Sequence, residues 1–331
     1  MTKVTYSQIA KVAGVGSATV ERTLNDRGGV RPQTVQKVLA AAKELGWKGQ
    51  LPEVHRRILR IEVIIVRPET SFYARVGAAF RRIAASLDSS VQIQITYLDE
   101  NDPEGIAERI RDQSINRAGL IISAPDHPLV RDALANAIRC GLPVVQMVSR
   151  IVPDADLVGI DNYAAGRMAG LMMAKLGEKK GAVAAICHSQ AYQVHRDRIR
   201  GFSDYLIEQG RGLDFRFVIF GNDNREASFE RLDKALVNWP DLVGVYNAGG
   251  ANTAIVKVLG LRKRDVFFVG HELTEVTRAG LKDGTVDVVF DQLPEAQVRR
   301  AIDLMLARLH VIQDRIDNAP IRFTTITAEN L

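Results

Sequence analysis

A cluster of polar residues between positions 17 and 25 has the chemistry needed to read DNA. Ser17, Glu21, Arg22 and Asn25 share the outer face of a predicted helix with Ala18. Hydroxyl, carboxylate, guanidinium and amide groups donate or accept hydrogen bonds at base edges in the major groove. The pattern therefore predicts a recognition helix, with an ordinary helical hairpin as the alternative.

Two short helices must position this polar face. Apolar residues recur at helical spacing on the inner side of residues 5–25, and Gly14-Val15-Gly16 separates the two helices. A helix-turn-helix needs a small residue where its helices cross, a turn with Gly and an apolar residue after it. Ala10, Gly14 and Val15 meet these needs in order. Gly14-x-Gly16 follows a helix and lacks the third Gly of a dinucleotide-binding fingerprint, so that interpretation is rejected.

A third predicted helix completes a domain of residues 1–46. Pro32 suits the first turn of this helix, and Gly46 suits its C-terminal end. Its spacing predicts a buried stripe made of Val35, Val38, Leu39, Ala42 and Leu45.

These residues closely resemble the DNA-binding headpiece of the LacI/GalR family. The resemblance is carried by Val4-Thr5, Ile9-Ala10, Ala13-Gly14-Val15, Thr19-Val20, Arg22, Asn25 and Val30-Arg31-Pro32-Gln33-Thr34. It implies that Arg22 contacts a base or a phosphate and that positions 17 and 18 select the operator sequence. Glu21 departs from the family's usual Ser; phosphate would repel its carboxylate, but a cytosine amino group can donate to it. The residues expected to contact DNA are Thr5, Tyr6, Ser17, Ala18, Thr19, Glu21, Arg22, Asn25 and Arg31.

Charge is unevenly distributed along the 331 residues. Residues 1–60 contain 11 Lys or Arg and 4 Asp or Glu, a net charge of +7, and the remaining 33 basic and 35 acidic residues leave −2. This layout favours a DNA-binding protein, because neutralising phosphates supplies much of the affinity for DNA. The two cysteines, Cys140 and Cys187, form no disulfide framework. Without a signal segment or a membrane-length apolar run, the sequence predicts a soluble, cytoplasmic protein.

Residues 47–60 are predicted to link the headpiece to the rest of the chain. Family members usually carry a hinge helix with the pattern Asn-x-x-Ala-Arg-x-Leu here, and this sequence lacks the pattern and contains Pro52. Residues that could still contact phosphates or wedge a base step are Leu51, His55, Arg56, Arg57 and Leu59. A solvated basic linker is the alternative.

From residue 61 onward, short apolar runs alternate with amphipathic helices. Predicted strands cover residues 61–66, 91–97, 120–122, 144–147, 183–186, 215–220, 243–246, 266–269 and 286–290. Predicted helices include residues 74–87, 103–115, 164–176, 195–208 and 294–309. This α/β alternation is typical of parallel sheets covered on both faces, and a run of this length splits into two doubly wound lobes.

This second region, residues 61–331, resembles the type I periplasmic sugar-binding-protein-like domain that LacI/GalR regulators share. The resemblance therefore covers nearly the whole chain. It implies three crossings between the lobes, near residues 149–159, 291 and 320, and a ligand in the cleft at the carboxyl ends of the strands. The expected boundaries are about 61–150 and 291–319 for lobe one, and about 159–290 and 320–331 for lobe two.

Polar and aromatic residues at the predicted strand ends suit a sugar, which needs hydrogen-bonding groups for its hydroxyls and an aromatic ring for its apolar face. Phe72 is the stacking candidate, with a core position in the next helix as the alternative. Arg198, in the motif Arg198-x-x-Gly201-Phe202, could hold two hydroxyls or a carboxylate, with a surface arginine as the alternative. The residues expected to contact the effector are Phe72, Tyr73, Asp126, His195, Arg198, Asn247, Glu272 and Gln292.

The family resemblance supplies part of this assignment. It implies that Asn247 and Glu272 bind hydroxyls and that Gln292 binds ligand from a lobe connection. Ala248-Gly249-Gly250 departs from the usual spacing, and Glu272 stands where relatives have a shorter Asp.

Two enzyme-like patterns are set aside. His271-Glu272-Leu273-Thr274-Glu275 lacks the second His of a zinc-protease helix. Cys187, His188 and His195 lack a fourth metal ligand at a useful spacing. With no nucleophile–base pair in view, we expect no metal, no cofactor and no enzymatic activity.

Taken with the resemblance, these features predict a transcriptional repressor that binds double-stranded operator DNA as a homodimer, with a tetramer left open. The predicted effector is a sugar, a sugar acid or a sugar phosphate; the charged forms are suggested by Arg67, His195, Arg196 and Arg198. No membrane partner is expected. The rivals are a sugar-binding transport protein, which would not need a basic headpiece, and an α/β enzyme, for which no catalytic set is seen.

Overall fold

The computed structural model describes residues 4–25, 27, 29–30, 32–49, 58–189, 192–222 and 224–331. The chain divides into two compact units, Met1–Ile58 and Leu59–Leu331, which we call the headpiece and the body. Among the helices of the described residues, none has the length and apolar character needed to cross a bilayer.

Three helices form the headpiece, in agreement with the sequence prediction. They are α1 (Tyr6–Ala13), α2 (Ser17–Leu24) and α3 (Pro32–Glu44). Gly14 ends α1 with a φ of 65°, in the left-handed region where a side chain costs energy. Helix α3 contacts both shorter helices. The buried core of the headpiece consists of Ile9, Ala10, Ala13, Val20, Leu24, Val38, Ala41 and Ala42.

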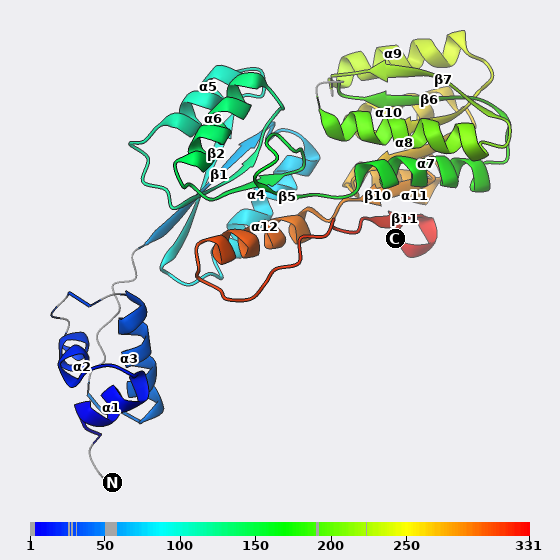
Figure 1. Cartoon of the computed structure of the whole chain (residues 1–331). Coiled ribbons are helices and arrows are strands. Elements are labelled where there is room, and N and C mark those ends of the chain that lie inside the picture. Colours follow the sequence, from blue (N-terminus) through cyan, green and yellow to red (C-terminus); the bar gives the residue numbers. More distant parts are fainter. Residues whose placement is uncertain are drawn as a thin grey trace. The chain divides into compact units, whose positions relative to one another are not determined.

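Lobe one of the body is built on a five-stranded parallel sheet (Figure 1). In spatial order its strands are β2 (Val91–Leu98), β1 (Leu59–Val66), β3 (Gly119–Ser123), β4 (Val144–Met147) and β5 (Asp156–Val158). Its helices are α4 (Ser71–Ala84), α5 (Pro103–Arg111), α6 (Pro128–Arg139) and α12 (Pro294–Arg308). Because neighbouring residues of a strand face opposite sides, Val63 packs with α4 and α12, and Ile64 packs with α5 and α6.

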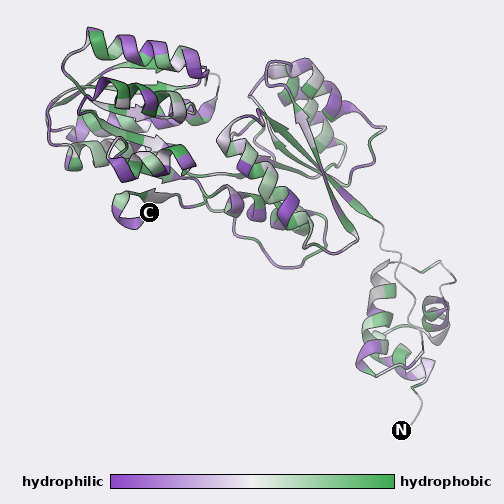
Figure 2. Ribbon diagram, turned by 180° about the vertical axis from the view of Figure 1, so that it is seen from behind, coloured by the Kyte–Doolittle hydropathy of each residue, from purple (hydrophilic) through white to green (hydrophobic). Residues whose placement is uncertain are grey.

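Lobe two is built on a six-stranded sheet. In spatial order its strands are β11 (Thr324–Ile326), β10 (Val288–Asp291), β9 (Phe267–His271), β8 (Leu242–Asn247), β6 (Gly181–Cys187) and β7 (Leu213–Phe220). Its helices are α7 (Asn162–Leu176), α8 (Gln193–Gln209), α9 (Arg225–Asn238), α10 (Asn252–Arg262) and α11 (Glu275–Asp283), followed by the 3₁₀ turn Ala328–Asn330. Figure 2 shows predominantly hydrophobic strands in both lobes, as expected for sheets covered on two faces. The predicted α/β class with two lobes is therefore confirmed.

Helices α7 and α8 pack closely against one face of the second sheet. Two glycines allow this approach. A Cβ at Gly166 would collide with the carbonyl oxygen of Arg198, and a Cβ at Gly201 would collide with that of Tyr163. This packing holds the start of α8, which carries His195 and Arg198, in a fixed position.

Two short edge strands were not predicted, and they alter the expected arrangement. Strand β5 belongs to the first sheet, so lobe one extends beyond residue 150 and the first crossing follows Val158. Strand β11 pairs antiparallel with β10, in a sheet that was expected to be parallel. Ile160 and Ile321 form an isolated bridge, so the first and third crossings lie side by side.

Candidate functional site

The headpiece presents the outer face of α2. Ser17, Ala18, Arg22 and Asn25 are exposed, whereas Val20 on the opposite face is fully buried. Gly16 is the N-cap residue of α2 and, having no side chain, makes no side-chain capping bond. The exposed residues are those that the sequence analysis placed on the DNA-reading face.

Glu21 has a local partner in the headpiece. Its carboxylate accepts a hydrogen bond from Arg27 at 3.3 Å, with both side chains substantially exposed. Asn25 donates from Nδ2 to the main-chain oxygen of Glu21 at 3.0 Å. An exposed ion pair contributes only about 0–1 kcal/mol, so little free energy holds the Glu21 carboxylate away from another donor.

The other predicted DNA contacts within the described residues lie at the start of α1 and in the first turn of α2. Thr5 caps α1 in a capping box with Gln8, its N–H donating to Gln8 Oε1 at 2.8 Å. Thr19 is half-buried in the first turn of α2. The ring of Tyr6 lies 5.4 Å from that of Trp47, and the main-chain N–H of Trp47 donates to the main-chain oxygen of Ala42 at 2.9 Å. Trp47, which the sequence analysis placed in the linker, therefore packs on the headpiece, whereas Arg31 and linker residues 50–57 lie outside the described residues.

The body contains a small cavity between its lobes, which we call the inner chamber. Its volume is about 70 Å³. Its wall is formed by Arg67, Thr70, Ser71, Phe72, Tyr73 and Val148 of lobe one, and by Tyr192, Val194, His195, Arg198, Gly249, Gly250, Asn252, Glu272 and Gln292. Most of these residues follow the carboxyl ends of strands, where doubly wound folds place their ligands.

Arg198 is the fixed centre of one wall. It is 4% exposed. Its guanidinium donates to Asn162 Oδ1 at 2.7 Å, to the main-chain oxygen of Ala248 at 2.9 Å and to Gln292 Oε1 at 2.7 Å. These hydrogen bonds fix the orientation of the Arg198 guanidinium and of the Gln292 amide. The two predicted effector residues therefore form one preorganised unit.

Glu272 continues this chain of polar contacts. Gln292 donates from Nε2 to Glu272 Oε1 at 2.5 Å, and Arg75 donates to Glu272 Oε2 at 3.1 Å. Burial, and then the charge of Asp291, raise the pKa of Glu272 to about 7, whereas Arg75 and Gln292 oppose the rise. Glu272 also has a φ of 71°, an uncommon value for a residue with a side chain.

Arg75, on α4 of lobe one, was missed by the sequence analysis. Its guanidinium reaches Asp291 at 2.6 Å and Glu295 at 3.0 Å in addition to Glu272. Burial opposes its charge, but the hydrogen bond and the charge of Asp291 raise the pKa of Arg75 above its ordinary value. Arg75 thus connects lobe one to the ends of β9 and β10. Arg75 and Glu272 are 197 residues apart in the sequence.

Phe72 and Tyr73 both reach the inner chamber. Their rings meet edge to face, with centroids 5.2 Å apart. Tyr73 is buried, and its hydroxyl lies 3.0 Å from Ser123 Oγ. Phe72 is half-buried and keeps part of its ring exposed, so the stacking role remains a prediction for Phe72.

Rings also line the opposite wall. His195 lies 5.8 Å from Tyr192 and 5.9 Å from His188, measured between ring centroids. The Tyr192 hydroxyl donates to Glu100 of lobe one, and Arg67 pairs with the same carboxylate at 3.2 Å. Burial raises the pKa of Tyr192, so this hydroxyl stays protonated as a donor. Tyr192 and Glu100 were not identified from the sequence, because their partners lie in the other lobe.

Two predicted effector residues occupy other positions. Asn247 is fully buried and donates from Nδ2 to Gly250 at 2.8 Å and to Asn252 Oδ1 at 2.7 Å. It therefore shapes the loop after β8, and Asn252 lines the chamber in its place. Asp126 pairs with Arg131 and is not among the described residues that line the chamber.

The enzyme-like His271 lies in the core of lobe two. Its Nε2 is 2.8 Å from the hydroxyl of Tyr246. Complete burial lowers its pKa well below the ordinary value, so the ring is neutral. Within the described residues, no group of three or more His, Cys, Asp or Glu side chains is arranged to hold a metal ion.

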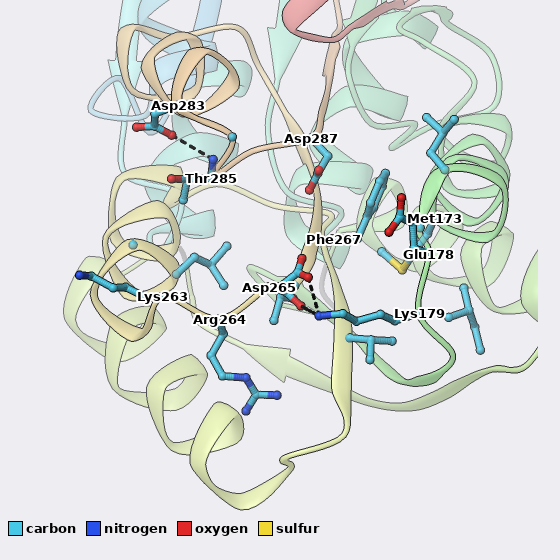
Figure 3. Close-up of a pocket in the computed structure, with 18 residues that line it drawn as sticks. Met173, Glu178, Lys179, Lys263, Arg264, Asp265, Phe267, Asp283, Thr285 and Asp287 are labelled. Atoms are coloured by element: carbon cyan, nitrogen blue, oxygen red, sulfur yellow. Dashed lines mark hydrogen bonds and ion pairs between the residues drawn. The ribbon is translucent and has the colours of Figure 1, made fainter.

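A second hollow, of about 430 Å³, lies at the amino ends of the lobe-two strands (Figure 3). Lys179 pairs there with Asp265 at 2.5 Å, and Asp287 accepts from the main-chain N–H of Phe268 at 2.7 Å. These charged groups are engaged with the protein, and the hollow lies at the end of the sheet opposite the inner chamber. It therefore belongs to a different surface from the predicted effector site.

Comparisons with known proteins cover both units. Residues 5–50 match the model of bacterial regulatory proteins of the lacI family, and residues 61–310 match a periplasmic binding protein domain. The HTH-type transcriptional regulator DegA of Bacillus subtilis is 26% identical over 284 residues, covering 82% of each chain. A sucrose operon repressor of Klebsiella pneumoniae is 28% identical over 237 residues, covering 69% of this chain and 68% of that protein.

Solved structures resemble the body in fold. A solute-binding protein of an ABC transporter from Burkholderia graminis, in complex with D-arabinose, is similar with a TM-score of 0.73 at 20% identity. The alignment covers 84% of this chain and 98% of that chain. The glucose-galactose binding protein GanP of Geobacillus stearothermophilus has a TM-score of 0.71 at 18% identity, covering 82% and 98%.

Proposed function

We propose how this chain acts on the premise that it belongs to the lacI family of bacterial regulatory proteins and is a DNA-binding transcriptional regulator with a periplasmic-binding-protein domain. In our proposal it is a repressor that works in the cytoplasm. The headpiece reads an operator, and a small sugar or sugar derivative bound between the lobes of the body changes the affinity for that operator. Sugar acids and sugar phosphates fall within this effector class.

The observation that carries the proposal is the polar chain Arg198–Gln292–Glu272–Arg75, which joins both lobes at the wall of the inner chamber. A ligand that displaces or completes these bonds binds one arrangement of the lobes better than another. Only that difference in affinity can shift the equilibrium between the arrangements. A coupling of about 1–3 kcal/mol is typical, which corresponds to roughly 5–150-fold in DNA affinity.

The roles of the chamber residues follow from their chemistry. Phe72 stacks on the apolar face of the sugar, and Arg198, Gln292 and Glu272 bind its hydroxyls. His195 contacts the ligand from the same wall as Arg198. Asn247 acts indirectly by holding the loop that carries Asn252.

Two copies of the headpiece are needed to read a pseudo-palindromic operator, so we propose a homodimer. Arg22 contacts a base or a phosphate, and Ser17 and Ala18 select the sequence. Glu21 exchanges its exposed pair with Arg27 for a hydrogen bond from a cytosine amino group.

The test is binding of the full chain to the DNA upstream of its own gene, measured by fluorescence anisotropy at a fixed salt concentration. We expect specific binding, and Arg22→Ala should weaken it roughly tenfold or more while leaving the melting temperature unchanged. Lys43→Ala, which removes an exposed cation from α3, is the matched control. Equal affinity of the Arg22 variant and the wild type would remove Arg22 from the interface.

A plain sugar-binding protein is the second candidate, favoured by the fold that the body shares with transporter solute-binding proteins. The same DNA-binding measurement, made with and without sugar, separates the two functions. Sugar binding without any sequence preference in DNA binding would support the transport role. Sugar-dependent operator affinity supports the regulator.

A further inference from the structure

A larger cavity adjoins the inner chamber in the cleft of the body, and we call it the outer chamber. Its volume is about 590 Å³. The two chambers share a wall, because Arg67, Thr70, Ser71, Gly250 and Asn252 line both. The contact between Tyr192, which lines the inner chamber, and Glu100, which lines the outer one, marks the boundary between them.

The wall of the outer chamber mixes donors and acceptors. Its hydroxyl and amide groups come from Thr70, Ser71, Asn222, Asn252, Thr253 and Thr274, and its charged groups come from Arg67, Glu69, Glu100, Arg225 and Glu275. Helices α4, α9, α10 and α11 all begin at this wall, which adds main-chain N–H donors.

The charges argue against an anionic occupant. Three carboxylates face two guanidinium groups, and one of these, that of Arg67, already pairs with Glu100 at 3.2 Å. A phosphate or carboxylate here would be repelled by Glu69 and Glu275. Sugar hydroxyls both donate and accept, so they match a wall that offers carboxylate oxygens beside N–H and O–H groups.

Arg225 is the side chain best placed to contact such an occupant. It is exposed in the first turn of α9 and lines the chamber. In the described part of the chain it has no hydrogen bond or ion pair that would have to be broken first. The cations that suggested a charged sugar are engaged in other ways, since Arg196 donates to Gln193 at 2.6 Å and Arg198 holds Gln292.

We propose that the effector is a neutral glycoside of at least two sugar units, with one unit in the inner chamber and the next in the outer chamber. This inference rests on the proposed function, because it presumes that the cleft binds sugar. It adds a second subsite that recognises the extension of the ligand, with Arg225 as a direct contact.

The experiment is titration calorimetry of the full chain with three sets of probes. These are neutral disaccharides of pentoses and hexoses, their constituent monosaccharides, and the phosphates of those monosaccharides. We expect at least one disaccharide to bind about tenfold or more tightly than its constituents and than their phosphates, a difference of the size that a few added hydrogen bonds supply.

Variants locate the second unit. Arg225→Gln should weaken the preferred disaccharide about fivefold, the loss of one charge-assisted contact, and leave the monosaccharide affinity within about twofold. Lys234→Gln, which removes an exposed cation from the same helix, is the matched control and should change neither affinity.

The outcomes separate this inference from the function on which it rests. If no probe of any set binds, both the proposed sugar response and the second subsite are refuted. If a monosaccharide or its phosphate binds as tightly as every disaccharide, or if Arg225→Gln and the wild type bind the disaccharide equally, the second subsite alone is refuted.

Discussion

Replacing Glu272 by Gln should stabilise the body at pH 8 and flatten the dependence of its stability on pH. The Glu272 side chain is buried, and burial together with Asp291 raises its pKa to about 7, from an ordinary value of 4.5. Between these two values the folded chain keeps a proton that the unfolded chain has released. The free energy of unfolding therefore falls as the pH rises through this window.

The size of the effect follows from the two pKa values. Each pKa unit is worth about 1.4 kcal/mol, so the window corresponds to roughly 3 kcal/mol. Gln cannot ionise, and its amide oxygen can still accept from Gln292 or Arg75. The stability advantage of Glu272→Gln over the wild type should thus be smallest at pH 5 and larger by about 3 kcal/mol at pH 8.

The assay is urea unfolding between pH 5 and pH 8, without sugar. The chain contains two tryptophans, Trp47 in the headpiece and Trp239 in lobe two. A Trp47→Phe background therefore isolates the fluorescence change of the body. Glu108→Gln, which removes an exposed carboxylate from α5, is the control for loss of one negative charge. Parallel stability curves for Glu272→Gln and the wild type would refute the reasoning.

Three further predictions concern the sugar response, the headpiece and the packing that holds the cleft. Arg198→Ala should keep DNA affinity within about twofold of wild type and lose the response to sugar, because it frees Gln292. Arg200→Ala, on the same helix, is the control and should retain the response. A normal response in the Arg198 variant would show that the effector site lies elsewhere. Thr5→Ala removes the cap of α1 and should lower headpiece stability by about 1 kcal/mol in thermal denaturation followed by circular dichroism; an unchanged melting curve would show that the cap is dispensable. Gly201→Ala places a Cβ against the carbonyl of Tyr163 and should cost about 3 kcal/mol or more in urea unfolding, and a neutral effect would mean that α7 and α8 can separate.

Local patterns were sufficient for most of the secondary structure. Strands such as β1 and β4 are short, apolar and flanked by turns, and helices such as α12 repeat apolar residues at helical spacing. Strands β5 and β11 have three residues each, with partly exposed positions at the sheet edges. Such segments have too few buried residues to show the alternation of apolar and polar positions that is typical of a strand. Their pairing therefore depends on the neighbouring strand.

Several predicted effector residues lie at strand ends and line the inner chamber, and their contact with an effector stays a prediction. Arg198, Glu272 and Gln292 each follow or cover a carboxyl end in lobe two, and all three line the inner chamber. Asn247 also ends a strand, but its amide turns inward to its own loop. The direction of a side chain at a strand end depends on the loop conformation, which spacing does not specify.

The sequence by itself determined the architecture and the chemistry of the headpiece, because helical periodicity, a Gly turn and a polar face lie within some forty consecutive residues. Only the tertiary structure decided which charges meet in the cleft. Arg75 reaches Glu272 across 197 residues, and Tyr192 reaches Glu100 across 92. Those contacts arise because the crossings bring the strand ends of the two lobes together. No local sequence pattern indicates which residues of the two lobes will meet.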